Sequence, residues 1–373
     1  MHIKFMTAVL ALAFGAAQAQ EVVKIGHVAA TSGPSAHLGK DDENGARMAI
    51  EDLNAQGFKI NGKIVKFVLL PEDDAADPKQ GTAAAQKLVD AKINGVIGHQ
   101  SSGTSIPASK IYFDAGIPQI SASATSPLYT HQNYNTTFRV VANDNKLGGT
   151  LGQYAVRKLG AKRIAVIDDR TAYGQGVASE FVKAIKAPGV ELVDKQFTTD
   201  KATDFNAILT SIKSKNPDLV FFGGMDSVGG PLLRQMKALG IKARYMGGDG
   251  ICTEALSKLA GGADDSITCA EAGGVPASQK KHLEAFAARY RQKYQQDVQI
   301  YAPYVYDAVM TMATAMANAK SADPAKYLPY LHQVRYQGLT GPISFDQYGD
   351  IKDGALTLYT YKDGKRMLLE VIR

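Results

Sequence analysis

The amino-acid sequence predicts an α/β protein of two lobes, and three observations support this prediction. From Val22 onward, short runs rich in β-branched and aromatic residues alternate with amphipathic stretches of helix length. This alternation runs to about residue 121 and begins again near residue 147, so that two similar halves follow each other. The 373 residues are enough for two ordinary domains, and a composition of 45% hydrophobic and 21% charged residues excludes a disordered chain.

The first 19 residues are expected to be a signal peptide that is removed on export. Lys4 supplies the positive charge, the stretch from Phe5 to Ala17 is apolar, and Ala17-Gln18-Ala19 provides a cleavage site of small residues. The apolar run is shorter than the roughly 20 residues that a membrane anchor needs. No cysteine stands at the cleavage site, because the first cysteine of the chain is Cys252. We therefore expect a protein that begins at Gln20 and is free in the periplasm, with no lipid anchor and no inserted segment.

In the first half, strand and helix patterns alternate in the way typical of a parallel sheet with helices on both faces. The helix predicted over 40–56 places Ile50 and Leu53 on one face and ends at Gly57. The helix predicted over 78–91 has a proline at its start, where the missing N–H of proline is harmless. The other elements follow the same alternation, with strands at 22–28, 64–70, 95–98 and 117–121 and a helix at 104–115.

The second half repeats this alternation, and the end of the chain departs from it. Strands are predicted at 163–168, 191–197, 219–222 and 244–246, and helices at 147–159, 176–186, 205–215 and 231–239. Two helices, at 280–295 and 303–319, then precede two segments that alternate polar and apolar residues, at 343–345 and 355–361. Lys362-Asp363-Gly364 predicts a hairpin turn at the end of the second segment.

Loops that follow strands of the first half are rich in hydroxyl groups. In open α/β sheets, ligands bind beyond the carboxyl ends of the strands, so these loops are candidate binding segments. One runs from His99 to Ser105 and the next from Ser121 to Pro127, and both stand at helix starts, where free backbone N–H groups favour an anion. An ordinary helix cap explains each single serine or threonine equally well. Two such loops in neighbouring units, however, favour a binding role for Ser102 and Thr125.

The loops of the second half carry different groups. Asp168 to Gly176, Gly223 to Asp226 and Gly247 to Gly250 each follow a predicted strand. Asp249 is a lone carboxylate among glycines, which lets a cation approach it closely, and Tyr173 offers an aromatic face. These loops therefore add a candidate cation ligand, with a turn or capping role for Asp249 as the alternative.

The sequence lacks the motifs of common enzymes and metal sites. Gly174-Gln175-Gly176 has only part of a dinucleotide fingerprint, and Thr104-Ser105 stands where a phosphate-binding loop needs Lys followed by Ser or Thr. No nucleophile elbow is present, and the seven histidines form no helical pair for a metal. Lys and Arg are scattered along a chain of net charge +6, which argues against a nucleic-acid partner. We therefore expect a binding protein with no cofactor, no metal and no catalytic residues.

Cys252 and Cys269 are the only cysteines, and they lie 17 positions apart. In an oxidising compartment, two cysteines favour one disulfide over a metal site, because a metal site would need more ligands. Two buried free thiols are the alternative.

Short motifs along the whole mature chain form a specific combination. They are Thr31-Ser32-Gly33-Pro34, Gly39-Lys40 to Gly45-Ala46, Asp73-Asp74 to Asp77-Pro78, Ile97-Gly98-His99, Pro107-Ala108-Ser109, Ser123-Ala124-Thr125-Ser126-Pro127, Tyr173-Gly174-Gln175-Gly176 and Gly341-Pro342-Ile343-Ser344-Phe345-Asp346. Together they resemble the branched-chain amino-acid binding proteins of ABC transporters. The resemblance implies the type I periplasmic binding protein fold, in which two Rossmann-like lobes with parallel sheets are joined by three hinge crossovers and close on a ligand. It also implies that one lobe consists of 20–140 and 273–345 and the other of 141–272 and 346–373.

The resemblance assigns a role to residues of the two hydroxyl loops. Ser102 and Thr125, with the backbone around Ser101 and Ser123, would bind the α-carboxylate of an amino acid. This role agrees with the anion site that the helix starts predict.

Five further positions match pocket residues of the family. Asp249 falls where the family carries an acidic residue for the α-ammonium group, Tyr173 matches a tyrosine of the closing lobe, and Leu38 and Tyr301 would line the side-chain pocket. Three of these positions depart from the best-known members. Asp249 is one methylene shorter than their glutamate, Leu38 replaces an aromatic residue, and Met225 replaces a tyrosine. The departures predict a roomier or differently shaped side-chain pocket.

The resemblance implies further expectations about covalent links and partners. The disulfide of the best-known members matches Ala76 and Ser101, so a bridge between Cys252 and Cys269 would replace it elsewhere in the fold. The expected partners are a small amino-acid ligand and the membrane permease of an ABC importer, and the protein is expected to be a monomer. The alternatives are a sensor on the same fold, an amide, urea or aromatic-acid ligand, and an exported enzyme.

Overall fold

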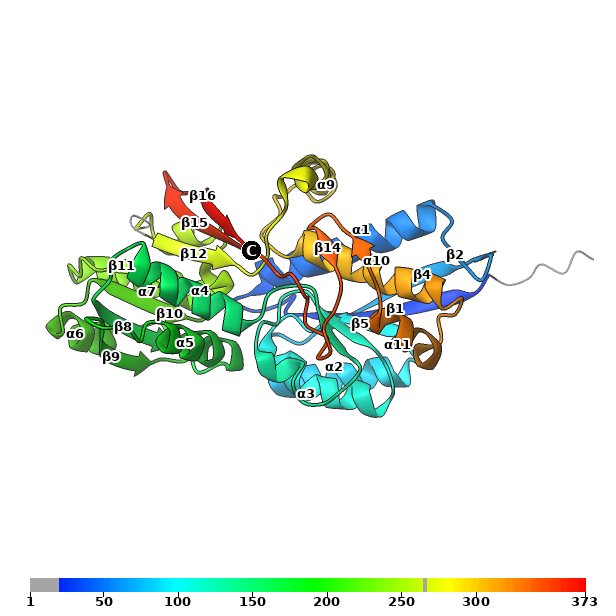
Figure 1. Ribbon diagram of the computed structural model, residues 1–373, viewed down its shortest axis with the longest axis horizontal. Helices are drawn as coiled ribbons and strands as arrows, with labels where there is room; N and C mark the ends of the chain where they lie inside the picture. Colours follow the sequence, from blue (N-terminus) through cyan, green and yellow to red (C-terminus); the bar gives the residue numbers. More distant parts are fainter. Residues whose placement is uncertain (1–19, 264–266) are drawn as a thin grey trace, which may run out of the picture.

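The computed structural model describes residues 20–263 and 267–373, which form two β-sheets arranged side by side along the long axis of the molecule (Figure 1). We call the part around the five-stranded sheet the first lobe and the part around the seven-stranded sheet the second lobe. The predicted signal peptide, residues 1–19, lies outside the described residues. Within the described ranges, no helix is both long and apolar enough to cross a bilayer. The predicted α/β architecture with two lobes is confirmed.

Five parallel strands form the sheet of the first lobe. They are β1 (Val22–Ala29), β4 (Lys66–Asp73), β5 (Gly95–Gly98), β6 (Gln119–Ser121) and β7 (Thr137–Arg139), in the spatial order β4-β1-β5-β6-β7. The helices of this lobe are α1 (Ala36–Ala55), α2 (Pro78–Asp90), α3 (Ser102–Asp114), α9 (Lys280–Tyr294), α10 (Ala302–Asn318) and α11 (Pro324–His332). Successive residues of a strand face opposite sides. Ile25 and Ile97 therefore join the core on the side of α1 and α10, whereas Val28 and Val96 pack with α2 and α3.

The sheet of the second lobe has seven strands in the order β16-β15-β12-β11-β10-β8-β9. They are β8 (Arg163–Asp168), β9 (Glu191–Phe197), β10 (Leu219–Gly223), β11 (Arg244–Gly247), β12 (Ile267–Glu271), β15 (Leu356–Lys362) and β16 (Lys365–Ile372). The first five in chain order pair in parallel, and β15 and β16 add an antiparallel hairpin at the edge. The predicted hairpin turn is present, with Asp363 and Gly364 both at positive φ.

Helices cover both faces of this second sheet. They are α4 (Asp144–Arg157), α5 (Ala172–Ala184), α6 (Asn206–Ser214), α7 (Asp226–Ala238) and the short α8 (Leu256–Leu259). Val166 and Phe221 pack on the side of α4 and α5, where Phe181 stacks on Phe221 with ring centroids 3.9 Å apart. Ile167 and Val220 face the opposite side, in the core with α6 and α7.

The remaining elements are short. They are the hairpin strands β2 (Lys59–Ile60) and β3 (Lys63–Ile64), the paired strands β13 (Tyr336–Gln337) and β14 (Pro342–Ile343), and the 3₁₀ turns η1 (Pro127–Tyr129), η2 (Asp249–Ile251) and η3 (Ala277–Gln279).

The chain passes between the two sheets after β7, after β12 and after β14. A buried ion pair joins the first of these crossovers to the third. Arg139, fully buried at the end of β7, donates from Nε to Asp350 Oδ1 at 2.8 Å, and Asp350 also accepts hydrogen bonds from Thr130 and Asn143. Asn143 in turn caps the start of α4. The network thus fixes the geometry of the connection between the lobes. The exact residues at which one lobe ends and the other begins stay a prediction.

The short elements β2, β13 and α8 are missing from the sequence prediction, and so are the strands β7 and β12 and the helix α11. Both strands are short, with three and five residues, so neither offers enough positions for a clear alternation. Pro324 opens α11, where proline is harmless, but Pro329 stands inside it, which argues against a helix unless tertiary packing stabilises it. Tyr327 and Leu331 provide that packing, because both are fully buried.

Five helices begin earlier than the apolar pattern indicates. The starts of α1, α3, α4, α5 and α7 are Ala36, Ser102, Asp144, Ala172 and Asp226, where the sequence predicts 40, 104, 147, 176 and 231. The first turns of these helices are built largely from small and polar residues, which carry no apolar periodicity. As a result, several residues predicted to lie in loops stand in first helical turns.

Cys252 and Cys269 are joined by a disulfide in the structure, with an S–S distance of 2.03 Å. Both cysteines are fully buried, and the bond ties the segment after η2 to β12. The loop that carries Asp249 is therefore anchored to the second sheet.

Candidate functional site

Most of the predicted site residues meet at one small cavity between the lobes. The cavity has a volume of ≈ 30 Å³ and is lined by Gln100, Ser101, Ser102, Ser123, Tyr173, Met225, Asp249 and Tyr301. Seven of these eight residues belong to the predicted set, and Gln100 does not. Leu38 and Thr125 are buried but are not among the lining residues of this cavity. In this structure the cavity has room for about two water molecules, so a ligand of amino-acid size requires the surrounding side chains to move apart.

The lining residues stand where strands end and helices begin. Ser102 is the first residue of α3, Tyr173 lies in the first turn of α5, and Met225 and Tyr301 immediately precede α7 and α10. Asp249 opens the η2 turn that follows β11. The starts of helices from both lobes therefore surround the cavity, and their free N–H groups give it a positive potential.

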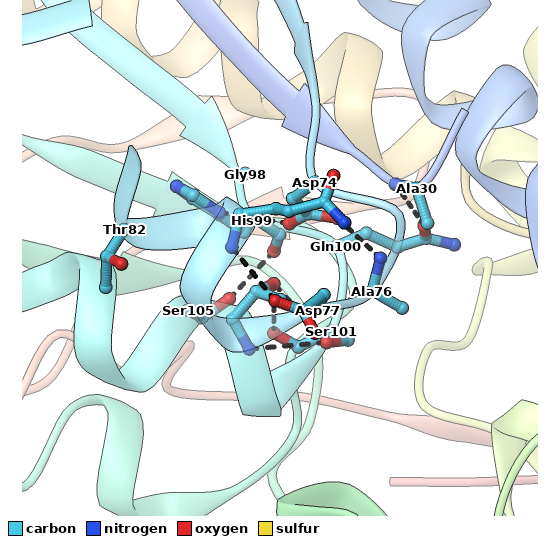
Figure 2. Close-up of polar contacts among 12 residues, drawn as sticks. Ala30, Asp74, Ala76, Asp77, Thr82, Gly98, His99, Gln100, Ser101 and Ser105 are labelled. Atoms are coloured by element: carbon cyan, nitrogen blue, oxygen red, sulfur yellow. Dashed lines mark hydrogen bonds and ion pairs between the residues drawn. The ribbon is translucent and has the colours of Figure 1, made fainter. Parts of the chain in front are cut away.

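A buried polar network holds the loop that carries Ser101 and Ser102. His99 bonds through Nδ1 to Asp74 and through Nε2 to Tyr112, each at 3.1 Å, and the Ser105 hydroxyl donates to the His99 carbonyl at 2.9 Å (Figure 2). His99 is fully buried and both of its ring nitrogens have partners, so it is a structural residue. The network positions the hydroxyl loop without taking part in the cavity itself.

The four predicted hydroxyl residues differ in how their oxygens are used. Ser101 caps α3, and the Ser123 hydroxyl donates to the Gln100 carbonyl at 2.8 Å. Ser102 Oγ accepts from the Ser126 N–H at 3.1 Å, which leaves its own O–H free to donate. Thr125 Oγ1 is buried and has no partner among the described residues. Ser102, which lines the cavity, is thus the hydroxyl group available to an anion there, whereas the Thr125 hydroxyl faces Asp144.

Asp249 is a buried carboxylate held by two tyrosines from different lobes. Tyr173 donates to Oδ1 at 2.7 Å and Tyr301 donates to Oδ2 at 3.0 Å. The Tyr173 oxygen also accepts from the Gly250 N–H at 2.9 Å, which fixes the ring. Burial raises the pKa of Asp249 to about 6, so at neutral pH the carboxylate is mostly ionised. Among the described residues it has no Lys, Arg or His within ion-pair distance, which leaves a place for a cation from outside the protein.

Two buried polar residues near the site were missed by the sequence analysis. Asp144 lies in the first turn of α4, its N–H donates to the Thr125 carbonyl at 2.8 Å, and neither carboxylate oxygen has a partner among the described residues. Burial raises the pKa of Asp144 to about 8, the nearby Thr125 hydroxyl opposes this shift, and the charge of Asp249 adds to it. No pattern in the sequence indicates that Asp144 lies next to Thr125. The second residue, Gln100, lies in the loop from His99 to Ser105, which the sequence does indicate as a binding segment.

Contacts across the cavity show that the lobes are closed in this structure. Besides Tyr301 and Asp249, His37 at the start of α1 lies with Nε2 2.8 Å from Oδ2 of Asp226 at the start of α7. Asp226 is fully buried and also accepts from the Thr253 hydroxyl at 2.5 Å. Burial alone would lower the pKa of His37, but the hydrogen bond and charge of Asp226, with the charge of Asp41, outweigh it and raise the pKa.

Comparison with known proteins places this geometry in a family. The model of the periplasmic binding protein family matches residues 22–365. The Leucine-, isoleucine-, valine-, threonine-, and alanine-binding protein of Pseudomonas aeruginosa is 34% identical over 351 residues, covering 93% of this chain and 92% of the relative. The Leucine-specific-binding protein of Salmonella typhimurium is 35% identical over 349 residues, covering 92% of each chain.

A solved structure agrees with these sequence relatives. The branched-chain amino acid transporter substrate binding protein of Streptococcus pneumoniae, in complex with isoleucine, superimposes with a TM-score of 0.85 at 28% identity, covering 94% of this chain and 99% of that one. This match confirms the predicted type I periplasmic binding protein fold. The chain therefore belongs to the periplasmic binding proteins, in the group of branched-chain amino-acid substrate-binding proteins of ABC transporters that its motifs resemble.

Proposed function

We propose that this protein captures a small amino acid, branched-chain or otherwise aliphatic, by closure of its two lobes and presents it to the permease of an ABC importer. The observation that carries the proposal is the pairing of opposite polarities in one closed cavity. Asp249 offers a buried carboxylate without a cationic partner, and Ser102 offers a free O–H at the start of α3. An α-ammonium and an α-carboxylate, carried by one zwitterion, complement both ends of such a site.

The side chain of the ligand would lie against the remaining walls. Met225 lines the cavity, and its flexible thioether adapts to ligands of different shape. Leu38 lies in the buried core and does not line the cavity.

Closure couples binding to the shape of the protein. Tyr301 belongs to the first lobe and Asp249 to the second, so their hydrogen bond exists only when the lobes are together. Closing an empty site buries an ionised carboxylate without a cation, which is unfavourable. A ligand ammonium removes this penalty and shifts the population towards the closed state. The reaction is binding and release, without catalysis.

The cellular context of this proposal comes from the relatives. They are named as amino-acid-binding proteins, and the matched structure is the substrate-binding component of a transporter. We accordingly propose a monomeric, non-catalytic protein of the periplasm, exported by its leader, with the amino acid and the permease as its partners.

A thermal-shift panel tests the proposed ligand class. Mature protein is unfolded and refolded to remove bound ligand, then heated with each of the twenty amino acids, with amides and urea, and with aromatic acids. A ligand at a thousand times its Kd stabilises the protein by about 4 kcal/mol, so true ligands should raise Tm by several degrees. Shifts confined to small aliphatic amino acids and their close analogues support the proposal. Shifts only with compounds that lack an ammonium group would contradict it.

Amino-acid affinity is also expected to fall as pH rises through the raised pKa of His37. The protonated imidazole pairs with Asp226 only in the closed state, so its contribution to closure is complete below the ordinary pKa of 6.5 and is lost above the raised value. Calorimetry between roughly pH 6 and pH 9 should show a larger loss of affinity in the wild type than in His37→Gln, in which Asp249 and Asp144, with pKa values of about 6 and about 8, still titrate. His282→Gln, which changes an exposed histidine on α9, is the matched control and should behave as wild type. A wild-type affinity independent of pH would show that the His37–Asp226 contact does not support closure.

A further inference from the structure

Gln100 is the one cavity residue for which the proposed zwitterion site gives no role. It follows β5, is only 4% exposed, and lines both the central cavity and the adjoining cleft at its mouth. Its side chain extends from the hydroxyl loop towards Ala30 at the end of β1 (Figure 2). There its Oε1 accepts the Ala30 N–H at 3.1 Å.

The hydrogen bond to Ala30 fixes which end of the carboxamide is the donor. A reversed amide would set its NH₂ group against the Ala30 N–H, two donors facing each other. The Nε2 atom therefore occupies the other position, where it is buried and has no partner among the described residues. A buried donor without an acceptor is unfavourable, so the closed site lacks one acceptor at this point.

The neighbouring groups do not supply this acceptor. The Ser123 hydroxyl donates to the Gln100 carbonyl and Asp249 accepts from Tyr173 and Tyr301, and neither group lies within hydrogen-bond distance of Nε2. Met225 contributes a thioether, which is a weak acceptor. The missing acceptor is thus expected from the molecule that fills the cavity.

We propose that Gln100 is a specificity-determining residue whose Nε2 donates a hydrogen bond to an oxygen on the side chain of the ligand. Among amino acids of the same shape, the protein then prefers the member with a hydroxyl or carbonyl oxygen over the purely aliphatic one. This inference rests on the proposed function, because it needs an amino acid in the cavity, and it extends the ligand class from aliphatic amino acids to those of the same size and shape with a side-chain acceptor. A site that binds a polar side chain by a buried donor rejects the apolar isostere, since that isostere leaves the donor unpaired.

Calorimetry with shape-matched ligand pairs tests the inference. The pairs are threonine and valine, asparagine and leucine, and glutamine and methionine, each measured on ligand-stripped wild type and on Gln100→Met, which keeps an unbranched side chain of similar size. In the pair that binds most tightly, the wild type should prefer the acceptor-bearing member by about tenfold or more. Gln100→Met should abolish that preference while the apolar member binds at least as well as to wild type, which also shows that the variant is folded. Gln86→Leu, which changes an exposed glutamine on α2, should keep the wild-type preference.

Three results would overturn the inference and leave the proposed function intact. In the first, the wild type binds the apolar member of the pair as tightly as the polar one. In the second, Gln100→Met keeps the preference of the wild type. In the third, Gln100→Met lowers the affinity for both members by the same factor. The last result would place Nε2 on the α-carboxylate that all amino acids share. A wild type that binds no amino acid at all would instead remove the proposed function, and the inference with it.

Discussion

Replacement of Asp249 by alanine is expected to weaken amino-acid binding by a hundredfold or more. The carboxylate is 1% exposed, and in the closed state it faces the place where the ligand ammonium is expected. Without it, the ammonium would be buried in the closed site with no anionic partner. Removing one partner of a buried charge pair costs about 3–5 kcal/mol, and each tenfold change in Kd corresponds to about 1.4 kcal/mol.

The loss should follow the charge of Asp249 rather than the shape of its side chain. Asp249→Asn keeps the size and an oxygen that accepts from a tyrosine, but it removes the negative charge. It should therefore lose most of the affinity that Asp249→Ala loses. Asp204→Ala, on an exposed loop of the second lobe, is the control and should bind as wild type. An Asp249→Ala protein that binds its amino acid within about threefold of wild type would disprove the assignment.

Replacement of Asp350 by alanine is expected to destabilise the folded protein by about 3–5 kcal/mol, because it leaves the guanidinium of Arg139 buried without a counter-ion. Arg139 is fully buried, and its Nη1 atom donates to the carbonyls of Ala124 and Ser126, so the side chain is held in place and cannot move to solvent. Loss of Asp350 also removes the acceptor of Thr130.

Urea unfolding checks this prediction, with the exposed pair of Lys110 and Asp114 as the comparison. Asp114→Ala breaks an ion pair in which both side chains are more than half exposed, and such pairs contribute at most about 1 kcal/mol. Asp350→Ala should lower the midpoint several times more than Asp114→Ala. Equal effects of the two substitutions would mean that the buried network does not stabilise the connection between the lobes.

The position of the site could be predicted from the sequence because one rule of topology decides it. Parallel strands carry their carboxyl ends to the same edge of the sheet, so the loops after β5, β8, β10 and β11 had to contribute to one region. Ser102, Tyr173, Met225 and Asp249 come from these loops and line one cavity.

The orientation of individual side chains within that region could not be predicted. Thr125 and Leu38 come from the expected segments, yet neither lines the cavity, because the side to which a residue points depends on how the loop packs. Asp144 does not belong to the loops that this rule selects. It follows the crossover after β7, and β7 is too short to give a recognisable pattern in the sequence. Gln100 was not predicted as a site residue, because the neighbouring serines carry the hydroxyl groups that indicate an anion site.

The central claim is that the Asp249 carboxylate pairs with the ligand ammonium, and a double-mutant cycle between protein and ligand tests it most directly. Calorimetry compares the tightest-binding amino acid with its deaminated analogue, on wild type and on Asp249→Asn. If the two charges pair, the wild type should bind the amino acid at least about a hundredfold more tightly than the analogue, and Asp249→Asn should lose most of this discrimination. A wild type that binds both molecules equally, or an Asp249→Asn protein that discriminates as well as wild type, would contradict the claim.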